Sequence, residues 1–312
     1  KKDSIHIFGG PFDSWKITLA LFFSMFLGNR TYILTEPHTV IPSGLLANGN
    51  RFKNWLVHKA RPLKFGLLWI LLRNQVEGVF AISETAIDQL LSFGVSREKI
   101  LPYAYFVPPM QVSLNSADVE VIRDSSNEDL RLLFVGSLNH TKGVDLLVNA
   151  VNRLRKNGVN VTLDVFGPAE SLKEYCWSSC VRYRGIIPFG QAQSIMTTYE
   201  FLVLPSRYDG WGVVVNEALL AGIPVICSDR AGASSLIKRW NCGVCYGSAT
   251  DFGLEECILS VYQSKKLALS DFKEAIDLAC EIITPKYGAQ FIYDCVEKNK
   301  STGLDAKSSW YL

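Results

Sequence analysis

Short apolar runs alternate with amphipathic segments along the chain, and this alternation limits the fold more than any other feature. RLLFVG at 131–136, VTLDVFG at 161–167 and FLVLPS at 201–206 are short, rich in apolar residues and end at glycine or serine. The segment 144–156 instead repeats its apolar residues at helical spacing. Strands joined through helices form parallel sheets, because each helix carries the chain back across the sheet. The sequence therefore predicts an α/β protein.

The alternation falls into two series, and 312 residues are enough for two domains. Strands are expected at 5–8, 31–35, 78–83, 131–136, 161–167, 181–185, 201–206 and 224–228. Helices are expected at 14–27, 84–93, 144–156, 190–199, 213–222, 232–238, 252–264, 271–282 and 286–298.

A polar stretch at 107–127, which opens with Pro108-Pro109, is typical of a linker between the two series. We therefore expect two Rossmann-like domains, at 1–125 and 126–285. A C-terminal helix within 286–312 is expected to pack back on the first domain. The chain opens on a strand that runs into a glycine loop, so the first domain is expected to start late.

Composition excludes several classes of function. Hydrophobic residues make up 48% of the chain and charged residues 20%, which is typical of a globular protein, and the net charge of +2 gives no field for nucleic acid. The longest apolar run, 65–72, is too short to span a membrane. The eight cysteines are scattered, which favours a reduced, cytosolic protein. Cys242 and Cys245 form a CxxC without a second pair, and no zinc site is expected.

The segment SRYDGWGVVVNEAL places a glycine directly before a predicted helix. Free amides at the start of that helix, at Val213 and Val214, are suited to bind phosphate, and Gly212 lets the phosphate approach. Glu217, about one turn further on, can accept hydrogen bonds from a ribose diol. Asp209 would lie on the other side of the phosphate and accept hydrogen bonds from the hydroxyls of the group that is attached to the phosphate.

The loop VGSLNHTKGV repeats this arrangement after the strand at 131–136. Gly136, Ser137 and Lys142 lie between that strand and the helix at 144–156, where a lysine suits a diphosphate. The loop does not match a P-loop, because the spacing GxxxxGK[ST] is absent. Two such loops at the carboxyl edge of one sheet indicate a nucleotide-diphosphate site.

Three segments of the second series, FVGSLNHTKGVDLL, PSRYDGWGVVVNEALLAGIPVI and SDRAGASSLI, resemble the retaining GT-B glycosyltransferases of family 4. The resemblance implies two facing Rossmann-like domains with a cleft between them and transfer of a sugar from a nucleotide-sugar. It implies that Glu217 binds the donor ribose and Lys142 a phosphate. Asp209 takes the place of a glutamate that contacts the donor sugar. Ser137 takes the place of an arginine that contacts a phosphate, and we expect Arg207 to supply that contact instead.

In the first series, TEPHTV resembles the family segment whose histidine faces the transferred sugar, so His38 is expected to be a catalytic contact. His6, before a Gly-Gly pair, is expected only to line the acceptor side. His38 can instead be an ordinary loop histidine whose hydrogen bonds are satisfied. Together with Lys142 and Asp209, His38 completes the predicted catalytic set.

No Asp or Glu occurs between Glu36 and Glu77. The part Arg51–Arg73 combines six basic residues with four aromatic residues, Phe52, Trp55, Phe65 and Trp69. Basic and aromatic residues together suit an anionic lipid surface. The alternative is a packed helix whose lysines reach past apolar neighbours to water. Nucleic acid is not supported, because no known binding fold accompanies the charge.

The resulting functional prediction is a retaining, metal-independent hexosyltransferase that uses a UDP- or GDP-sugar and no further cofactor. Its acceptor is expected to be a lipid-linked glycan in cell-surface polysaccharide biosynthesis, for example of lipopolysaccharide. The enzyme is expected to be cytoplasmic and peripheral on the inner face of the cell membrane. Two alternatives stay open: a GT-B nucleotide-sugar epimerase and a non-catalytic module that binds a nucleotide-sugar.

Overall fold

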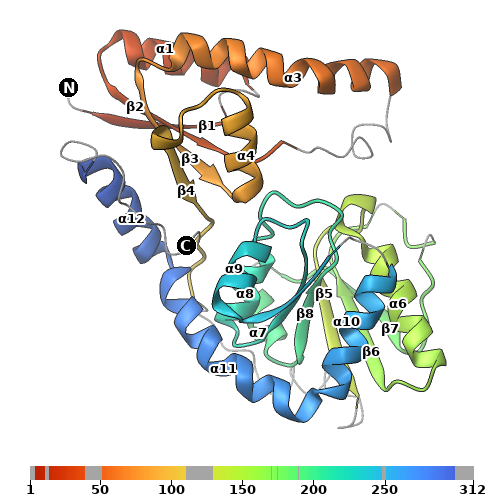
Figure 1. Cartoon of the computed structure of the whole chain (residues 1–312). Coiled ribbons are helices and arrows are strands. Elements are labelled where there is room, and N and C mark those ends of the chain that lie inside the picture. The colour runs from red at the N-terminus through yellow and green to blue at the C-terminus, as the bar shows by residue number, and fades with distance from the viewer. Residues whose placement is uncertain are drawn as a thin grey trace. The chain divides into compact units, whose positions relative to one another are not determined.

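A computed structural model describes residues 4–10, 14–38, 51–109 and 129–298, apart from 170, 174, 189 and 248–250. The chain forms two compact units, of which unit 1 comprises Lys1–Ala104 with Ala289–Leu312 and unit 2 comprises Tyr105–Gly288. Each contains one parallel sheet (Figure 1). The predicted α/β class is confirmed.

Unit 1 has a four-stranded parallel sheet in the order β1-β2-β3-β4. The strands are β1 (Ile5–Gly9), β2 (Arg30–Thr35), β3 (Val76–Ile82) and β4 (Ile100–Tyr103). The helices of unit 1 are α1 (Trp15–Phe26), α3 (Arg51–Leu72) and α4 (Glu84–Ser92), with the short turn η1 (Arg97–Lys99). Helix α12 (Pro285–Lys298) enters the unit at Ala289.

Helices α1, α3 and α4 share one hydrophobic core with the sheet, built around Leu21, Phe65 and Trp69. Phe65 and Trp69 are 0% and 3% exposed, so these two aromatic residues face the core and not a lipid surface as predicted. The periodicity of α3 could not decide this, because apolar residues occur on both sides of the helix.

Helix α12 packs against aromatic residues of the sheet, where Tyr103 stacks on Phe291 with ring centroids 6.1 Å apart. Arg30 forms an ion pair with Glu77 at 2.8 Å and donates a hydrogen bond of 2.9 Å to the carbonyl oxygen of Val296. Residues almost the whole chain apart in sequence thereby close the same unit.

Unit 2 has a six-stranded parallel sheet in the order β10-β9-β8-β5-β6-β7. Its strands are β5 (Leu130–Val135), β6 (Val161–Phe166), β7 (Val181–Gly185), β8 (Phe201–Leu204), β9 (Val225–Ser228) and β10 (Gly243–Tyr246). Its helices are α6 (Val144–Lys156), α7 (Ala192–Met196), α8 (Val214–Leu220), α9 (Ser234–Trp240), α10 (Asp251–Gln263) and α11 (Lys265–Ile282), with the turn η2 (His140–Lys142).

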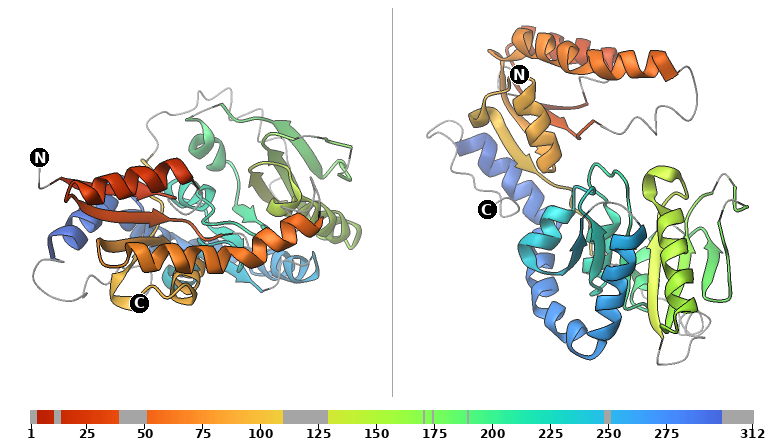
Figure 2. Two further views of the ribbon diagram at one scale, coloured as in Figure 1. Left: turned by 90° about the horizontal axis from the view of Figure 1, so that it is seen from above. Right: turned by 45° about the vertical axis from the view of Figure 1, so that its right-hand side comes forward.

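The helices of unit 2 lie on both faces of its sheet, with α6 and α10 on one face and α8, α9 and α11 on the other (Figures 1 and 2). Strands β6, β8 and β9 are buried along their full length, as expected for a parallel sheet covered on both faces. From β5 the chain continues to β6 on one side, whereas β8 lies on the other side. The strand order therefore changes direction between β5 and β8, where open α/β sheets bind ligands.

The main departures from the predicted elements have local causes. Strand β4, four residues long with a proline in it, was not predicted. The division between units falls at Ala104–Tyr105, about 20 residues before the expected boundary at 125, because Val107–Pro109 belong to unit 2. Residues 110–127 of the predicted linker lie outside the described residues.

Candidate functional site

The loops that follow β5 and β8 touch at Gly143. This residue has φ +68°, and a side chain on it would collide with the carbonyl oxygen of Pro205. The amide of Arg207 also donates a hydrogen bond of 2.9 Å to the carbonyl oxygen of Thr141. Only glycine allows both the backbone conformation and the close approach, so this residue fixes the two loops side by side.

The contact between the loops brings Lys142 and Asp209 together. The Lys142 Nζ lies 2.5 Å from the Asp209 Oδ2, and their side chains are 29% and 11% exposed. Two hydrogen bonds hold the backbone of Asp209. Its amide donates to the carbonyl oxygen of Arg230 at 3.2 Å, and its carbonyl oxygen accepts from the Gly232 amide at 3.1 Å. Two residues predicted from separate motifs therefore form one ion pair at the carboxyl edge of the sheet.

Arg207 lies in the same loop but is committed elsewhere. Its guanidinium donates two hydrogen bonds to the Asp145 carboxylate, at 2.7 and 2.6 Å, and one of 2.7 Å to the carbonyl oxygen of His140. Burial would raise the pKa of Asp145, but the hydrogen bonds and charge of Arg207 outweigh it and the pKa is lowered. In this arrangement Arg207 braces the first loop against α6. Its role as a phosphate ligand in place of an arginine at 137 stays a prediction.

The turn before α8 is anchored by Trp211, which is 1% exposed. Its indole Nε1 donates a hydrogen bond of 2.8 Å to the Oδ1 of Asn216, whose Nδ2 donates one of 2.9 Å to the Tyr105 carbonyl oxygen. Gly212 follows with φ +94°, and its missing Cβ would lie 3.6 Å from the Asp209 Oδ2. The ion pair therefore borders the start of α8, which begins at Val214, one residue later than predicted.

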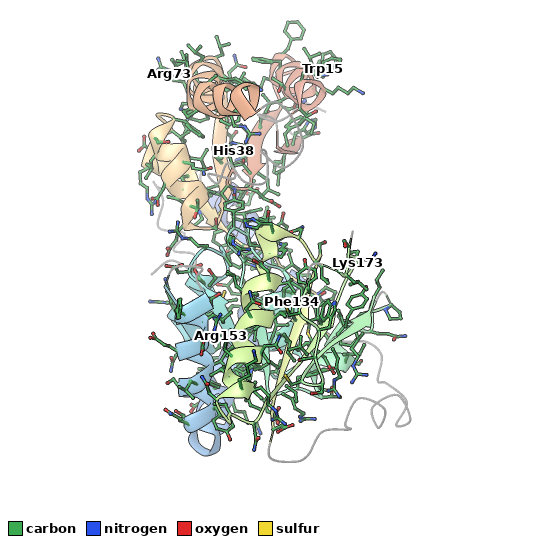
Figure 3. The ribbon with its side chains drawn as sticks, turned by 90° about the vertical axis from the view of Figure 1, so that its right-hand side faces the viewer. Trp15, His38, Arg73, Phe134, Arg153 and Lys173 are labelled. Carbon is green, nitrogen blue, oxygen red and sulfur yellow. The ribbon has the colours of Figure 1, made fainter. Side chains whose placement is uncertain are left out.

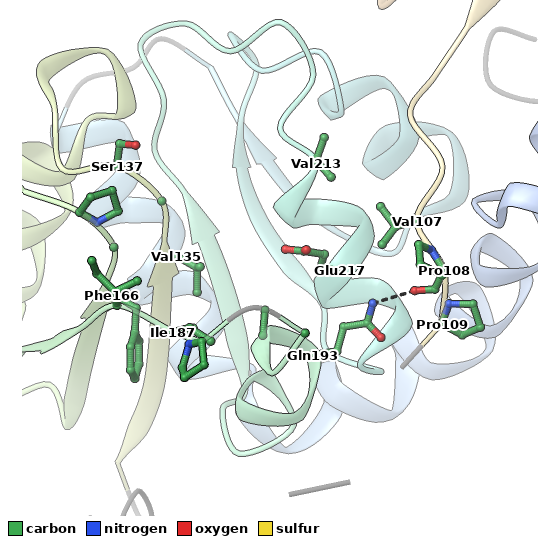
Figure 4. A pocket seen from close by; sticks show the side chains of 17 residues that line it. Val107, Pro108, Pro109, Val135, Ser137, Phe166, Ile187, Gln193, Val213 and Glu217 are labelled. Atoms are coloured by element: carbon green, nitrogen blue, oxygen red, sulfur yellow. Dashed lines mark hydrogen bonds between the residues drawn. The ribbon is translucent and has the colours of Figure 1, made fainter. Parts of the chain in front are cut away.

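A cavity of about 720 Å³ opens beside this turn within unit 2. Four predicted site residues line it, namely Gly136, Ser137, Val213 and Glu217 (Figure 4). The remaining wall is mostly apolar and contains Val107–Pro109, Phe166 and Ile186–Pro188. An apolar cavity with few polar groups is the usual form of a small-molecule site, and apolar walls suit the flat faces of a base.

Glu217 supplies the carboxylate of this cavity. Burial raises its pKa above the ordinary value. Among the residues that the structure describes, no ion pair or hydrogen bond to its side chain is found. A half-buried carboxylate without donors can accept hydrogen bonds from a ligand, such as those of two neighbouring hydroxyl groups.

The sequence did not predict Gln193 as part of the cavity. It is 8% exposed, and its Nε2 donates a hydrogen bond of 3.0 Å to the Pro108 carbonyl oxygen (Figure 4). This bond fixes the segment that enters unit 2 against α7, although the two residues are 85 positions apart in sequence. The one signal in the sequence is the pair Pro108-Pro109 between two α/β series, and by itself such a pair indicates a linker.

His38 belongs to unit 1, whereas all the residues that line the cavity belong to unit 2. Its ring stacks on Phe65 with centroids 4.3 Å apart, and Gln89 binds both its amide and its carbonyl oxygen, at 2.7 and 2.8 Å. Figure 3 shows it beneath α1 and α3. His6 lies on β1 with its Nδ1 2.8 Å from the Ser24 Oγ. The packing of both histidines accounts for them structurally, and a catalytic role of His38 stays a prediction.

The CxxC residues are not among those that line the cavity. Cys242 is buried, and Cys245 on β10 pairs in register with Cys227 on β9. In the described part of the chain, no three His, Cys, Asp or Glu residues lie together as metal ligands. Packing between two strands accounts for these thiols.

Known proteins resemble the chain in both fold and sequence. Anabaena Alr3699/HepE in complex with UDP superposes with a TM-score of 0.71 at 14% identity, over 91% of this chain and 77% of that one. HepE has also been solved with UDP-glucose. This likeness establishes the fold as that of the GT-B glycosyltransferases.

Two relatives match about half of the chain in sequence. The glycosyltransferase MJ1607 of Methanocaldococcus jannaschii is 24% identical over 174 residues, which are 52% of this chain and 44% of that protein. The amylovoran biosynthesis glycosyltransferase AmsK of Erwinia amylovora is 25% identical over 178 residues, which are 53% of this chain and 42% of that protein. The match spans less than half the length of each relative. Residues 118–275, just over half of the chain, match the family model of the glycosyl transferases group 1, and the chain belongs to that family.

Proposed function

We propose that the protein is a retaining glycosyltransferase that moves a hexosyl group from a UDP- or GDP-sugar to a glycan acceptor. The observation that supports this most is an apolar cavity that contains Glu217, together with the Lys142–Asp209 ion pair beside Gly212, the residue before Val213 of the cavity wall. A nucleoside diphosphate-sugar has a base that fits the apolar wall, a ribose diol that fits Glu217 and a diphosphate that fits Lys142. HepE, which shares the fold, has been solved with such a donor.

The donor is held from its ribose end to its sugar end. Glu217 accepts hydrogen bonds from the ribose hydroxyls. The diphosphate lies over Gly212, where the amides of Val213 and Val214 face it and Lys142 neutralises its charge. Gly136 and Ser137 close the opposite wall.

The ion pair rearranges when the donor binds. Lys142 leaves the Asp209 carboxylate for the diphosphate, because that group carries more negative charge than one carboxylate. Asp209 then accepts hydrogen bonds from hydroxyls of the donor sugar. The pair thus keeps two binding groups in place before the donor arrives.

Transfer proceeds on one face of the sugar. As the bond to the diphosphate breaks, Lys142 and the backbone amides stabilise the charge that develops on the leaving oxygen. The departing phosphate takes the proton of the acceptor hydroxyl, and no metal ion or cofactor is required. His38 contacts the transferred sugar from unit 1.

The acceptor is a lipid-linked glycan of cell-surface polysaccharide biosynthesis, such as that of lipopolysaccharide. AmsK is named for the biosynthesis of a polysaccharide. The basic segment Arg51–Arg73 attaches the protein to the anionic inner face of the cell membrane. Within the described residues, no helix has the length and apolar character needed to cross a bilayer.

A non-catalytic donor-binding module is the second candidate, favoured by Ser137 in place of an arginine and Asp209 in place of a glutamate. Thermal unfolding with a panel of UDP-, GDP- and ADP-sugars tests the shared claim of both candidates. A true donor binds the folded state and raises the unfolding temperature by mass action. If no nucleotide-sugar or nucleoside diphosphate changes it, the donor site does not exist.

A further inference from the structure

Helices α1 and α3 each carry a second apolar face besides the one buried in the core. On α1, Trp15 and Phe26 are 70% and 85% exposed, and Phe23 lies between them on the same side. On α3, Leu63, Leu67 and Leu71 are exposed and four residues apart. Such spacing gives one stripe along each helix. A helix that is apolar on both sides is ordinarily covered on both sides.

The two stripes adjoin each other and form a single surface. An apolar groove of about 740 Å³ runs between the helices and is lined by Trp15 and Leu19 from α1 and by Leu63 and Leu67 from α3, among others. Figure 3 shows the helices side by side, with Trp15 labelled on α1. A contiguous exposed apolar surface on a folded domain marks an interaction site.

The charge on the two helices identifies the partner. Neither α1 nor α3 contains an Asp or a Glu. Lys16 and Lys64 are exposed beside the stripes and Arg61 is half-exposed, while Arg73 follows α3. A second copy of the chain would bring these cations against the same cations, with no acid on either helix to offset them. An anionic phospholipid bilayer matches both properties, because it offers acyl chains to the stripes and phosphates to the cations.

We propose that α1 and α3 lie together in the interface of an anionic bilayer, with the stripes among the acyl chains and Lys16, Arg61 and Lys64 at the phosphates. This deepens the proposed function, on which its biological meaning rests, since a lipid-linked acceptor is confined to the same surface. The sequence indicated only the segment Arg51–Arg73, with its basic residues and the aromatic residues Phe52, Trp55, Phe65 and Trp69. In the structure the rings of Phe65 and Trp69 are in the core, and the apolar contact with lipid comes from the outward stripes.

Sedimentation of the full chain with vesicles tests the proposal. The wild type is expected to bind vesicles of phosphatidylcholine and phosphatidylglycerol in equal parts, and to bind vesicles of phosphatidylcholine alone far more weakly. The double variant Phe23→Ser, Phe26→Ser is expected to lose about tenfold or more in binding, because two large rings no longer reach the acyl chains. The matched control is Phe252→Ser on α10, which removes a ring of 71% exposure from unit 2 and should leave vesicle binding unchanged.

Two further readouts separate the possible failures. Affinity for UDP and GDP, measured on the same variants, should stay at the wild-type value, because the cavity of unit 2 is not altered. Light scattering should show a monomer without lipid. The proposal is overturned if the wild type ignores anionic vesicles, if the Phe23 and Phe26 variant binds them as the wild type does, or if these residues instead support a dimer. If the protein binds anionic vesicles but no nucleotide, the proposed membrane surface is supported and the proposed glycosyltransferase function is overturned.

Discussion

Replacing Glu217 should affect nucleotide binding and protein stability differently. Its carboxylate lies in the cavity, and none of the described residues donates a hydrogen bond to it. In Glu217→Ala the ribose loses its hydrogen-bond acceptor. A hydrogen bond to a charged group contributes about 1.5–3 kcal/mol, so affinity for UDP or GDP should fall roughly 10- to 150-fold. Isothermal titration calorimetry measures this directly. Glu256→Ala, the same change at an exposed position on α10, serves as the control and should bind like the wild type.

Nucleotide affinity should fall when Glu217 is replaced, whereas the thermal stability of the unliganded protein should rise when the charge of this carboxylate is removed. Burial raises the pKa of Glu217 in the folded state above its ordinary value of 4.5, so the charged form is penalised there at neutral pH. Stability that this group contributes is therefore present below the unfolded-state pKa and lost as the pH rises through the folded-state pKa. Glu217→Gln should unfold at a higher temperature than the wild type at pH 7, and the difference should vanish below pH 4.5. Unchanged nucleotide affinity in Glu217→Ala would refute the assignment of the ribose to this carboxylate.

Three further predictions concern the charged residues. Lys142→Ala should lower transfer by roughly a hundredfold or more even with excess magnesium, and wild-type activity should survive EDTA; activity that is lost on chelation and restored by a divalent ion contradicts the metal-free mechanism. Asp209→Asn should reduce kcat more than nucleotide affinity, as steady-state kinetics and calorimetry will show; an equal loss in both would place Asp209 at the diphosphate instead of the sugar. Arg61→Ser with Lys64→Ser should weaken binding to anionic vesicles by about 1 kcal/mol each, together roughly 30-fold, at unchanged nucleotide affinity. Vesicle binding that ignores both changes would exclude these two cations from the membrane contact.

The sequence placed the loops of Lys142 and Asp209 at one edge of the sheet for a physical reason. Both residues follow strands of one parallel sheet, and the carboxyl ends of such strands lie at the same edge. The glycine at 143 then allows the two loops to touch. Local patterns were sufficient here because the sheet itself supplies the long-range order.

Other parts of the site depend on contacts that local patterns do not encode. Gln193 and Pro108 are joined by a hydrogen bond across 85 residues, so neither could be assigned to the cavity from its neighbours in sequence. Arg207 pairs with Asp145, which lies 62 positions away, and its neighbours in sequence do not indicate this contact. For α3, apolar residues on both sides left open which side would face the sheet, and Phe65 and Trp69, two of the aromatic residues assigned to the lipid surface, are buried.

The central claim is sugar transfer, and donor consumption with and without acceptor tests it most directly. The wild type is incubated with the nucleotide-sugar that stabilises it most, in the presence or absence of a lipid-linked glycan fraction. Release of UDP or GDP is followed, and the anomeric configuration of the product is determined by NMR. The account predicts release that depends on the acceptor and a product with the same anomeric configuration as the donor. Conversion of the donor without acceptor, or a product of inverted configuration, would contradict it.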